Sequence, residues 1–182
     1  NTGRGGFVDF EYFVRQGVTT RVGFEYLDSA IDLNDLGYLE GNDNMRLRAS
    51  HMRTVSNLGW AHENQFDMRG FVQRNHEELF TGGGVFFSDR LLLNDRSKLV
   101  ARASFQPKSY DDINSGGFGT FRIDERAATN VRWDSDPTQR WGVGIGTGFL
   151  EEAVGGNTWS GEGEIDWRPN DRLRASLATV YY

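Results

Sequence analysis

The chain has 182 residues, of which 37% are hydrophobic and 13% aromatic, and its formal net charge is -6 at pH 7. This length is enough for one domain, whereas a mean hydropathy of -0.58 without a long apolar run excludes a transmembrane helix. The acidic balance disfavours nucleic acid as a partner, and a sequence without cysteine has neither disulfides nor thiolate metal sites.

The N-terminal residues alternate between apolar and polar side chains. Residues 7–14 and 18–26 place valine and aromatic residues at every second position, with charged residues or glycine between them. This period of two is typical of a β-strand whose two faces differ. The Arg15-Gln16-Gly17 segment between the two stretches predicts a tight hairpin turn.

The next connection, residues 28–43, holds five acidic residues and no basic one. Oxygen ligands on a loop can bind Ca²⁺, but the spacing of an EF-hand is absent, so a solvated acidic loop is the better interpretation. We expect this loop to act as an outer lid or contact surface. Its candidate contact residues are Asp32, Asn34, Asp35 and Tyr38.

The middle of the chain predicts four further strands over residues 45–50, 60–72, 85–93 and 99–105, separated by turns or polar connections. The alternation is less regular here than at either end. The residues that depart from it are His62, Asn64, Phe86, Asp89 and Leu92.

A polar loop is predicted over 107–117, followed by one long strand over 118–133. A hairpin then joins this strand to 141–149, with a polar turn between Trp133 and Trp141. In the second strand of the hairpin every other residue is glycine, which leaves one face bare. A bare face lets a sheet curve or lets a neighbouring group lie against it.

Strands over 159–167 and 173–181 bring the total to ten. The predicted connections alternate in length along the whole chain, as in outer-membrane barrels with short periplasmic turns and longer extracellular loops. Short turns fall near residues 16, 58, 95, 136 and 170, and longer connections near 35, 78, 112 and 154. A Greek-key sandwich gives no reason for this alternation.

Four of the five tryptophans lie within two residues of a predicted short turn. They are Trp60, Trp133, Trp141 and Trp167. Tryptophan favours the membrane–water interface, because its ring is apolar and its N–H needs a polar partner. We interpret the four as an interfacial belt on the periplasmic side; the alternative is that they plug the strand ends of a soluble barrel.

The polar register carries arginines and carboxylates that we assign to the lumen of the barrel. The candidates are Arg122, Arg126, Arg132, Glu162, Glu164, Asp166, Arg172 and Arg174. Paired carboxylates are also the requirement of glycosidases. A network of arginine–carboxylate pairs is favoured over that chemistry, because such faces are expected in every barrel. No histidine pair with metal-site spacing and no nucleophile motif accompanies them, so we predict neither an enzyme nor a cofactor or metal site.

The segment Asn34–Leu39, followed by Asp43, resembles the N-D-x-G-[FY]-[LM] motif of the C-terminal barrel region, domain of unknown function 5916, of a bacterial family. The turns Trp167–Leu173 and Asn94–Arg96 are similar to that region as well. Proteins of this family also carry a carbohydrate-binding module of the family 9 type, which has no counterpart in these residues. The resemblance implies an outer-membrane barrel with a role in glycan handling.

The sequence thus predicts an all-β, antiparallel up-and-down transmembrane β-barrel in the outer membrane of a Gram-negative bacterium. Because the chain starts at Asn1 and stops at Tyr182 inside a strand, we expect residues 1–182 to be a single segment, truncated at both ends, of a larger barrel. The expected function is a conduit or scaffold for transport or export, with outer-membrane lipid and a glycan or exported substrate as partners. The alternatives are a segment of a TonB-dependent receptor barrel and a soluble antiparallel sheet that acts as a binding module.

Overall fold

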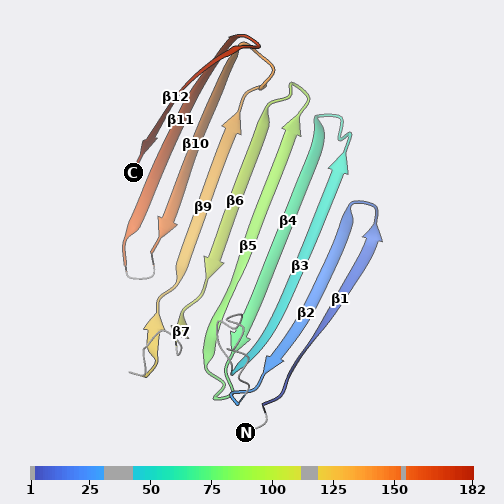
Figure 1. The fold of residues 1–182 in the computed structure, drawn as a ribbon, viewed down its shortest axis with the longest axis vertical. Helices are drawn as coiled ribbons and strands as arrows, with labels where there is room; N and C mark the ends of the chain where they lie inside the picture. Colours follow the sequence, from blue (N-terminus) through green and yellow to red (C-terminus); the bar gives the residue numbers. More distant parts are fainter. Residues whose placement is uncertain (1–2, 31–42, 112–118, 153–154) are drawn as a thin grey trace.

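The computed structural model of the protein describes residues 3–30, 43–111, 119–152 and 155–182, and every regular element in these ranges is a β-strand. Ten strands form one antiparallel sheet in up-and-down order (Figure 1), so this part of the prediction is confirmed. They are β1 (Gly5–Arg15), β2 (Val18–Leu27), β3 (Asn44–Ser56), β4 (Ala61–Arg74), β5 (Phe80–Leu93), β6 (Lys98–Gln106), β9 (Arg126–Asp134), β10 (Trp141–Glu151), β11 (Asn157–Asn170) and β12 (Leu173–Tyr181). No helix in the described ranges has the length and apolar character needed to span a bilayer.

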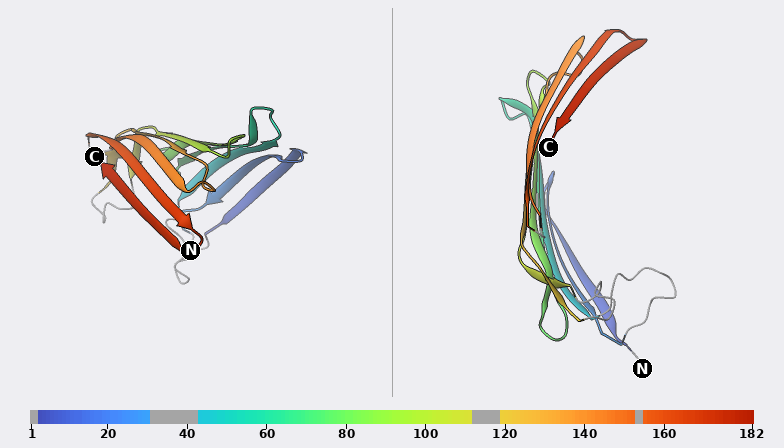
Figure 2. Two further views of the ribbon diagram at one scale, coloured as in Figure 1. Left: turned by 90° about the horizontal axis from the view of Figure 1, so that it is seen from above. Right: turned by 90° about the vertical axis from the view of Figure 1, so that its left-hand side faces the viewer.

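The sheet is open, because its edge strands β1 and β12 do not pair with each other. Figure 2 shows that the sheet curls and that both edges bend toward the same side. The described residues therefore form a curved single sheet and not a closed barrel.

The connections fall into two groups at opposite ends of the strands, as Figure 1 shows. Their lengths alternate less strictly than the sequence pattern predicts. Residues 75–79 join β4 to β5 and 152–156 join β10 to β11, whereas the turn over 135–140, expected to be short, is slightly longer than either. The strands extend beyond the predicted boundaries into the polar connections, because backbone pairing continues where the apolar alternation has already stopped.

The long strand predicted over 118–133 is wrong. Its first part is β8 (Phe121–Ile123), which pairs with β7 (Ser109–Asp111) in a separate two-stranded sheet, so the loop predicted over 107–117 also contains a strand. The break falls at Asp124 and Glu125. Both carboxylates lie near Lys108 Nζ, at 3.9 and 3.1 Å, close to the start of β7.

Pairing across the sheet places the apolar residues on one face. Val8, Phe24, Leu47 and Val72 are successive partners from β1 to β4, and all four are exposed. The same alignment continues at the other end of the sheet, where the exposed partners are Val143, Ile165 and Leu177. Among the described residues only Val18, Ala61 and Val100 are buried hydrophobic residues. Within the described ranges, the apolar face thus has no second layer against which to pack.

Candidate functional site

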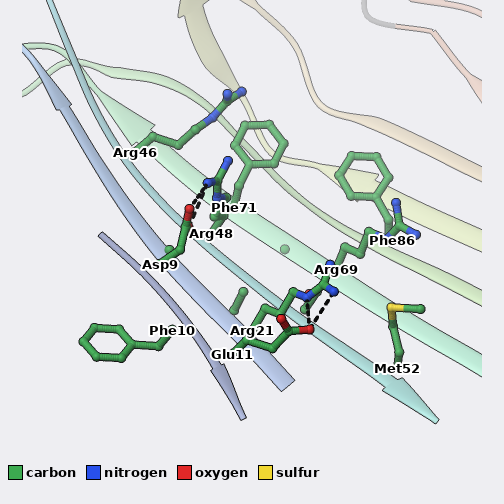
Figure 3. Close-up of a pocket in the computed structure, with 14 residues that line it drawn as sticks. Asp9, Phe10, Glu11, Arg21, Arg46, Arg48, Met52, Arg69, Phe71 and Phe86 are labelled. Carbon is green, nitrogen blue, oxygen red and sulfur yellow. Dashed lines mark hydrogen bonds and ion pairs between the residues drawn. The ribbon is translucent and has the colours of Figure 1, made fainter. Parts of the chain in front are cut away.

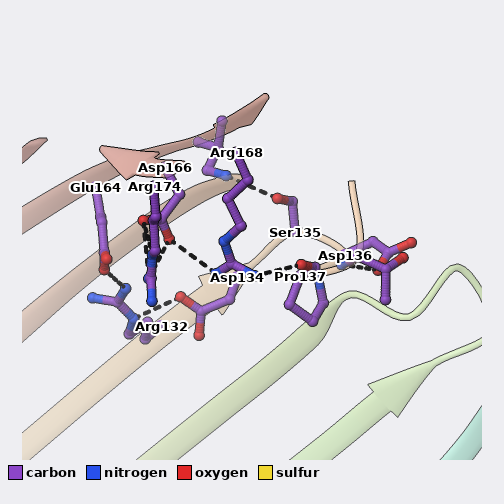
Figure 4. Close-up of polar contacts among 11 residues, drawn as sticks. Arg132, Asp134, Ser135, Asp136, Pro137, Glu164, Asp166, Arg168 and Arg174 are labelled. Carbon is purple, nitrogen blue, oxygen red and sulfur yellow. Dashed lines mark hydrogen bonds and ion pairs between the residues drawn. The ribbon is translucent and has the colours of Figure 1, made fainter. Parts of the chain in front are cut away.

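Arg132 contacts three carboxylates on the polar face, and Figure 4 shows two of them, Asp134 and Glu164. Its guanidinium donates to Asp134 at 2.8 Å and to Glu164 at 2.6 Å, and its Nη1 lies 3.1 Å from Glu162 Oε2. Asp134 is a neighbour on the same strand, β9, but the two glutamates belong to β11, so the arginine reaches across β10. The predicted network of Arg132, Glu162 and Glu164 is therefore present.

Glycine in the middle strand makes this reach possible. Gly146 of β10 is the direct partner of both Arg132 and Glu162. A Cβ built at Gly144 would lie 2.6 Å from Arg132 Nη2, and one at Gly146 would collide with the Glu162 side chain. The bare glycine strip is thus covered by the ion pair of the flanking strands.

The same arrangement occurs at the opposite end of the sheet. Asp9 of β1, Gly23 of β2 and Arg48 of β3 are successive cross-strand partners. Arg48 Nη2 donates to both oxygens of Asp9, at 2.8 and 3.0 Å, and a Cβ at Gly23 would collide with this pair. The sheet thus uses glycine twice to let charges on second-neighbour strands meet.

The remaining predicted polar residues are distributed differently. Arg174 donates two hydrogen bonds of 3.0 Å to Asp166, in a bidentate pair. Arg126 donates to Gln106 on the neighbouring strand β6. Arg122 lies on β8, outside the ten-stranded sheet, and its Nη2 lies 3.3 Å from Asp124 Oδ1. Arg172 lies in the turn after β11. The structure thus does not place Arg122 and Arg172 on the ladder predicted for them.

The four tryptophans of the predicted belt lie close to the short-turn end, but they are not arranged as the hairpin pattern predicts. Trp133 pairs with Ile145, whereas Trp141 pairs with Trp167 of β11, with ring centroids 5.9 Å apart. The reason is the register of β9 with β10, which leaves the first residues of β10 beyond the end of β9. Trp60 lies outside β4, before a bulge, with 59% of its surface exposed.

The off-pattern polar residues of the middle strands form a cluster on the apolar face. Arg53 donates to Asn64 at 3.1 Å, and Asn64 donates to Asp89. Asn64 retains only 5% exposure. On the same face Thr20 bonds to His51 Nδ1 at 3.0 Å. Residues that interrupt the alternation in the sequence are therefore mutual partners across β2 to β5.

The loop candidates Asp32, Asn34, Asp35 and Tyr38 lie outside the described residues. At the same end of the sheet, Asp43 bonds to His76 through both the backbone N–H and the ring Nδ1 of the histidine. The Nε2 of His76 lies 3.0 Å from the hydroxyl of Tyr26. These contacts hold the imidazole ring between the carboxylate of Asp43 and the hydroxyl of Tyr26. No sequence pattern predicts this contact, because the three residues are far apart in the chain.

A hollow of about 790 Å³ on the polar face lies over β1 to β5 (Figure 3), and we call it the aromatic hollow. Asp9, Arg21, Arg46, Arg48, Phe71 and Phe86 are among its lining residues. The rings of Phe71 and Phe86 are nearly parallel, with 6° between their planes and 6.3 Å between their centroids. A second hollow, of about 720 Å³, shares Phe86 and Arg69 with the first and extends to Arg102 and Asn130.

The aromatic hollow was missed in the sequence. The signal that points to it is a phenylalanine in the polar register, as with Phe86, but its convergence with Phe71 depends on the pairing of β4 with β5. Among the described residues no group of three histidines or carboxylates is placed to hold a metal ion. The side chains that line the hollow on this face are mainly arginines, carboxylates and phenylalanines.

The fold and this face define a class of protein: a curled, single-layer antiparallel sheet with one apolar and one charged face. Comparisons with protein-family models, with curated proteins and with solved structures find no match. The family resemblance of the acidic segment therefore stays a prediction.

Proposed function

We propose that the sheet is part of an outer-membrane β-barrel that serves as a conduit or scaffold for transport or export. The observation that carries this proposal is the exposed apolar face of a sheet that has no second layer. It includes Phe24, Leu47, Ile145 and Leu177, all exposed. Moving one such side chain from water to an apolar environment contributes roughly 1.5–3 kcal/mol. Lipid supplies that environment over the whole face at once.

The polar face supports the same proposal. Its charges meet in pairs and networks, such as Arg48 with Asp9 and Arg132 with two glutamates. Charges paired in this way suit the wall of a polar lumen. The curl of the sheet also brings the edges β1 and β12 toward one side (Figure 2). Open edges are not tolerated in lipid, so the proposal requires that both edges pair with further strands or with each other.

The alternative of a soluble binding module has less support. Such a module covers the apolar face of its sheet with a second sheet or with helices. The described residues contain neither, and the small sheet of β7 and β8 lies in the connection between β6 and β9.

Adjacent residues on opposite faces provide a direct test. The protein has no cysteine, so Asn130→Cys and Val131→Cys each introduce one labelling position at almost the same depth of β9. Each variant is labelled with an environment-sensitive fluorophore and folded into phosphatidylcholine vesicles. We expect quenching by spin-labelled lipid at position 131 and quenching by aqueous iodide at position 130.

Two outcomes contradict the proposal. One is a protein that does not associate with vesicles. The other is equal quenching of both positions by aqueous iodide, which means that water reaches both faces of β9.

A further inference from the structure

We propose that the aromatic hollow binds a carboxylate carried on a six-membered ring, with Arg46 receiving the carboxylate and Phe71 and Phe86 receiving the ring. This inference names a ligand class for the polar face. It relies on the proposed conduit only for the route by which the ligand arrives, so binding and membrane insertion are tested separately.

Among the described residues, Arg46 is the arginine of the hollow that lacks a carboxylate partner. Arg21, Arg48 and Arg69 form ion pairs with Glu11, Asp9 and Asp67, at 2.6 to 2.8 Å. In each of these pairs the carboxylate neutralises the arginine, so the three pairs contribute little net charge to the hollow.

Arg46 makes no ion pair among the described residues, and its Nε is buried without a hydrogen-bond partner. Its acidic cross-strand neighbour, Glu25, instead accepts a hydrogen bond from Asn44 at 3.4 Å. A guanidinium without a carboxylate partner attracts an anion with matching acceptors, and a carboxylate suits its planar geometry. The polar face thus keeps one cation available in the hollow.

The two phenylalanines indicate which chemical group the ligand carries beside its carboxylate. Arg46 Cζ lies 4.9 Å from the Phe71 centroid, and Phe86 continues the aromatic surface in a nearly parallel plane. Both rings are only partly buried, although their positions on β4 and β5 belong to the charged face. Aromatic surface on a polar wall gains most when the flat face of a ring covers it.

The size and charge of the site limit the ligand further. A hollow of about 790 Å³ is in the range of small-molecule sites, which are about 300–1,000 Å³. A single unpaired arginine favours one negative charge. Two kinds of molecule share this chemistry: acidic sugars and aromatic acids.

The test uses two pairs of probes that differ in the carboxylate: glucuronate with glucose, and benzoate with benzyl alcohol. Binding to the whole chain in detergent is measured by ligand-observed NMR titration. We expect at least one acid to bind tenfold or more tightly than its neutral partner. Glucuronate alone identifies an acidic sugar, benzoate alone an aromatic acid, and binding of both identifies the shared chemistry.

Variants then assign the residues. Arg46→Gln should reduce the affinity for the acid to that of the neutral probe, and Phe86→Leu, which keeps apolar bulk, should weaken binding about threefold to tenfold. Arg90→Gln is the matched control, because Arg90 is an exposed arginine on the polar side of β5 that does not line the hollow.

The proposal is overturned if wild-type protein binds neither acid, or binds each acid no better than its neutral partner. It is also overturned if Arg46→Gln and Arg90→Gln weaken binding equally. If the protein inserts into vesicles but does not bind either acid, this inference is rejected and the proposed conduit function is not affected.

Discussion

Single glycines decide which charges can meet on the polar face. Gly146 and Gly23 each lie between two charged partners on flanking strands, and each would collide with a side chain of that pair if it carried a Cβ. Glycine normally weakens a strand, because it costs conformational entropy and packs nothing. At these two positions that cost is offset by ion pairs that no larger residue would permit.

Gly146→Ala tests this role. The added methyl displaces the Glu162 side chain and weakens its contact with Arg132, so we expect a loss of about 1 kcal/mol in the free energy of unfolding. Gly163→Ala is the control, because the nearest atom to its added methyl lies at 3.6 Å, an ordinary contact. Urea unfolding followed by tryptophan fluorescence compares the two, and equal stabilities would contradict the role of Gly146.

The turn between β5 and β6 is held by the carboxylate of Asp95. The hydroxyl of Ser97 donates to Asp95 Oδ1 at 2.6 Å, and the Ser97 backbone N–H donates to the same oxygen at 2.9 Å. Both bonds favour the ionised form, so they lower the pKa of Asp95 below its usual value. The sequence predicts this turn, and the structure supplies the bonds that fix it.

The lowered pKa gives a pH dependence with a definite sign. A carboxylate whose pKa is depressed in the folded state stabilises the turn above its ordinary pKa of about 3.9. That stabilisation is lost as the pH falls through the folded pKa. An NMR titration should show Asp95 titrating below pH 3.9, and the Ser97 amide signal should shift with it. In Ser97→Ala the hydroxyl is removed, so the pKa of Asp95 should move back toward the ordinary value.

The strands themselves are largely predictable from the sequence, because alternation with a period of two survives in nearly all of them. The register in which neighbouring strands pair is not predictable from this alternation. The alternation around Trp133 and Trp141 is correct, yet the opposition of Trp141 to Trp167 depends on how β9, β10 and β11 slide against one another. The break before β9 also escapes the pattern, because it accompanies the pairing of β8 with β7 in a separate sheet.

The candidate site, like the sheet, is only partly predictable from the sequence. Arg132, Glu162 and Glu164 are predictable, since they fall in the polar register. The aromatic hollow is not, because it gathers residues from β1 to β5 whose neighbourhood is set by four successive pairings.

On the scale of the whole molecule, the apolar face of the described sheet carries a polar cluster whose energetic cost has to be offset. Asn64 accepts from Arg53 and donates to Asp89, and it is almost fully covered by them. A charged group on an apolar face is costly unless it is bonded. By bonding to both side chains, Asn64 lowers the free-energy cost of placing Arg53 and Asp89 on the apolar face.

Asn64→Ala should therefore be destabilising beyond the loss of one hydrogen bond. It leaves the groups of Arg53 and Asp89 without their shared partner, and we expect a loss of about 1–3 kcal/mol. Asn130→Ala on the polar face, where the amide makes one 3.4 Å bond to a carbonyl, should cost less. Urea unfolding in vesicles compares the two variants, and an equal loss would show that the apolar face imposes no special penalty.

The ion pairs over glycine have a consequence for how the sheet comes apart. In a simple meander each strand is coupled only to its immediate neighbours, so unfolding can advance one strand at a time from an edge. The pairs of Asp9 with Arg48 and of Arg132 with Glu162 couple strands that are second neighbours. Detaching β1 therefore loosens β3, and detaching β11 loosens β9. In a hydrogen-exchange experiment, β1, β2 and β3 should therefore lose protection together, and so should β9, β10 and β11.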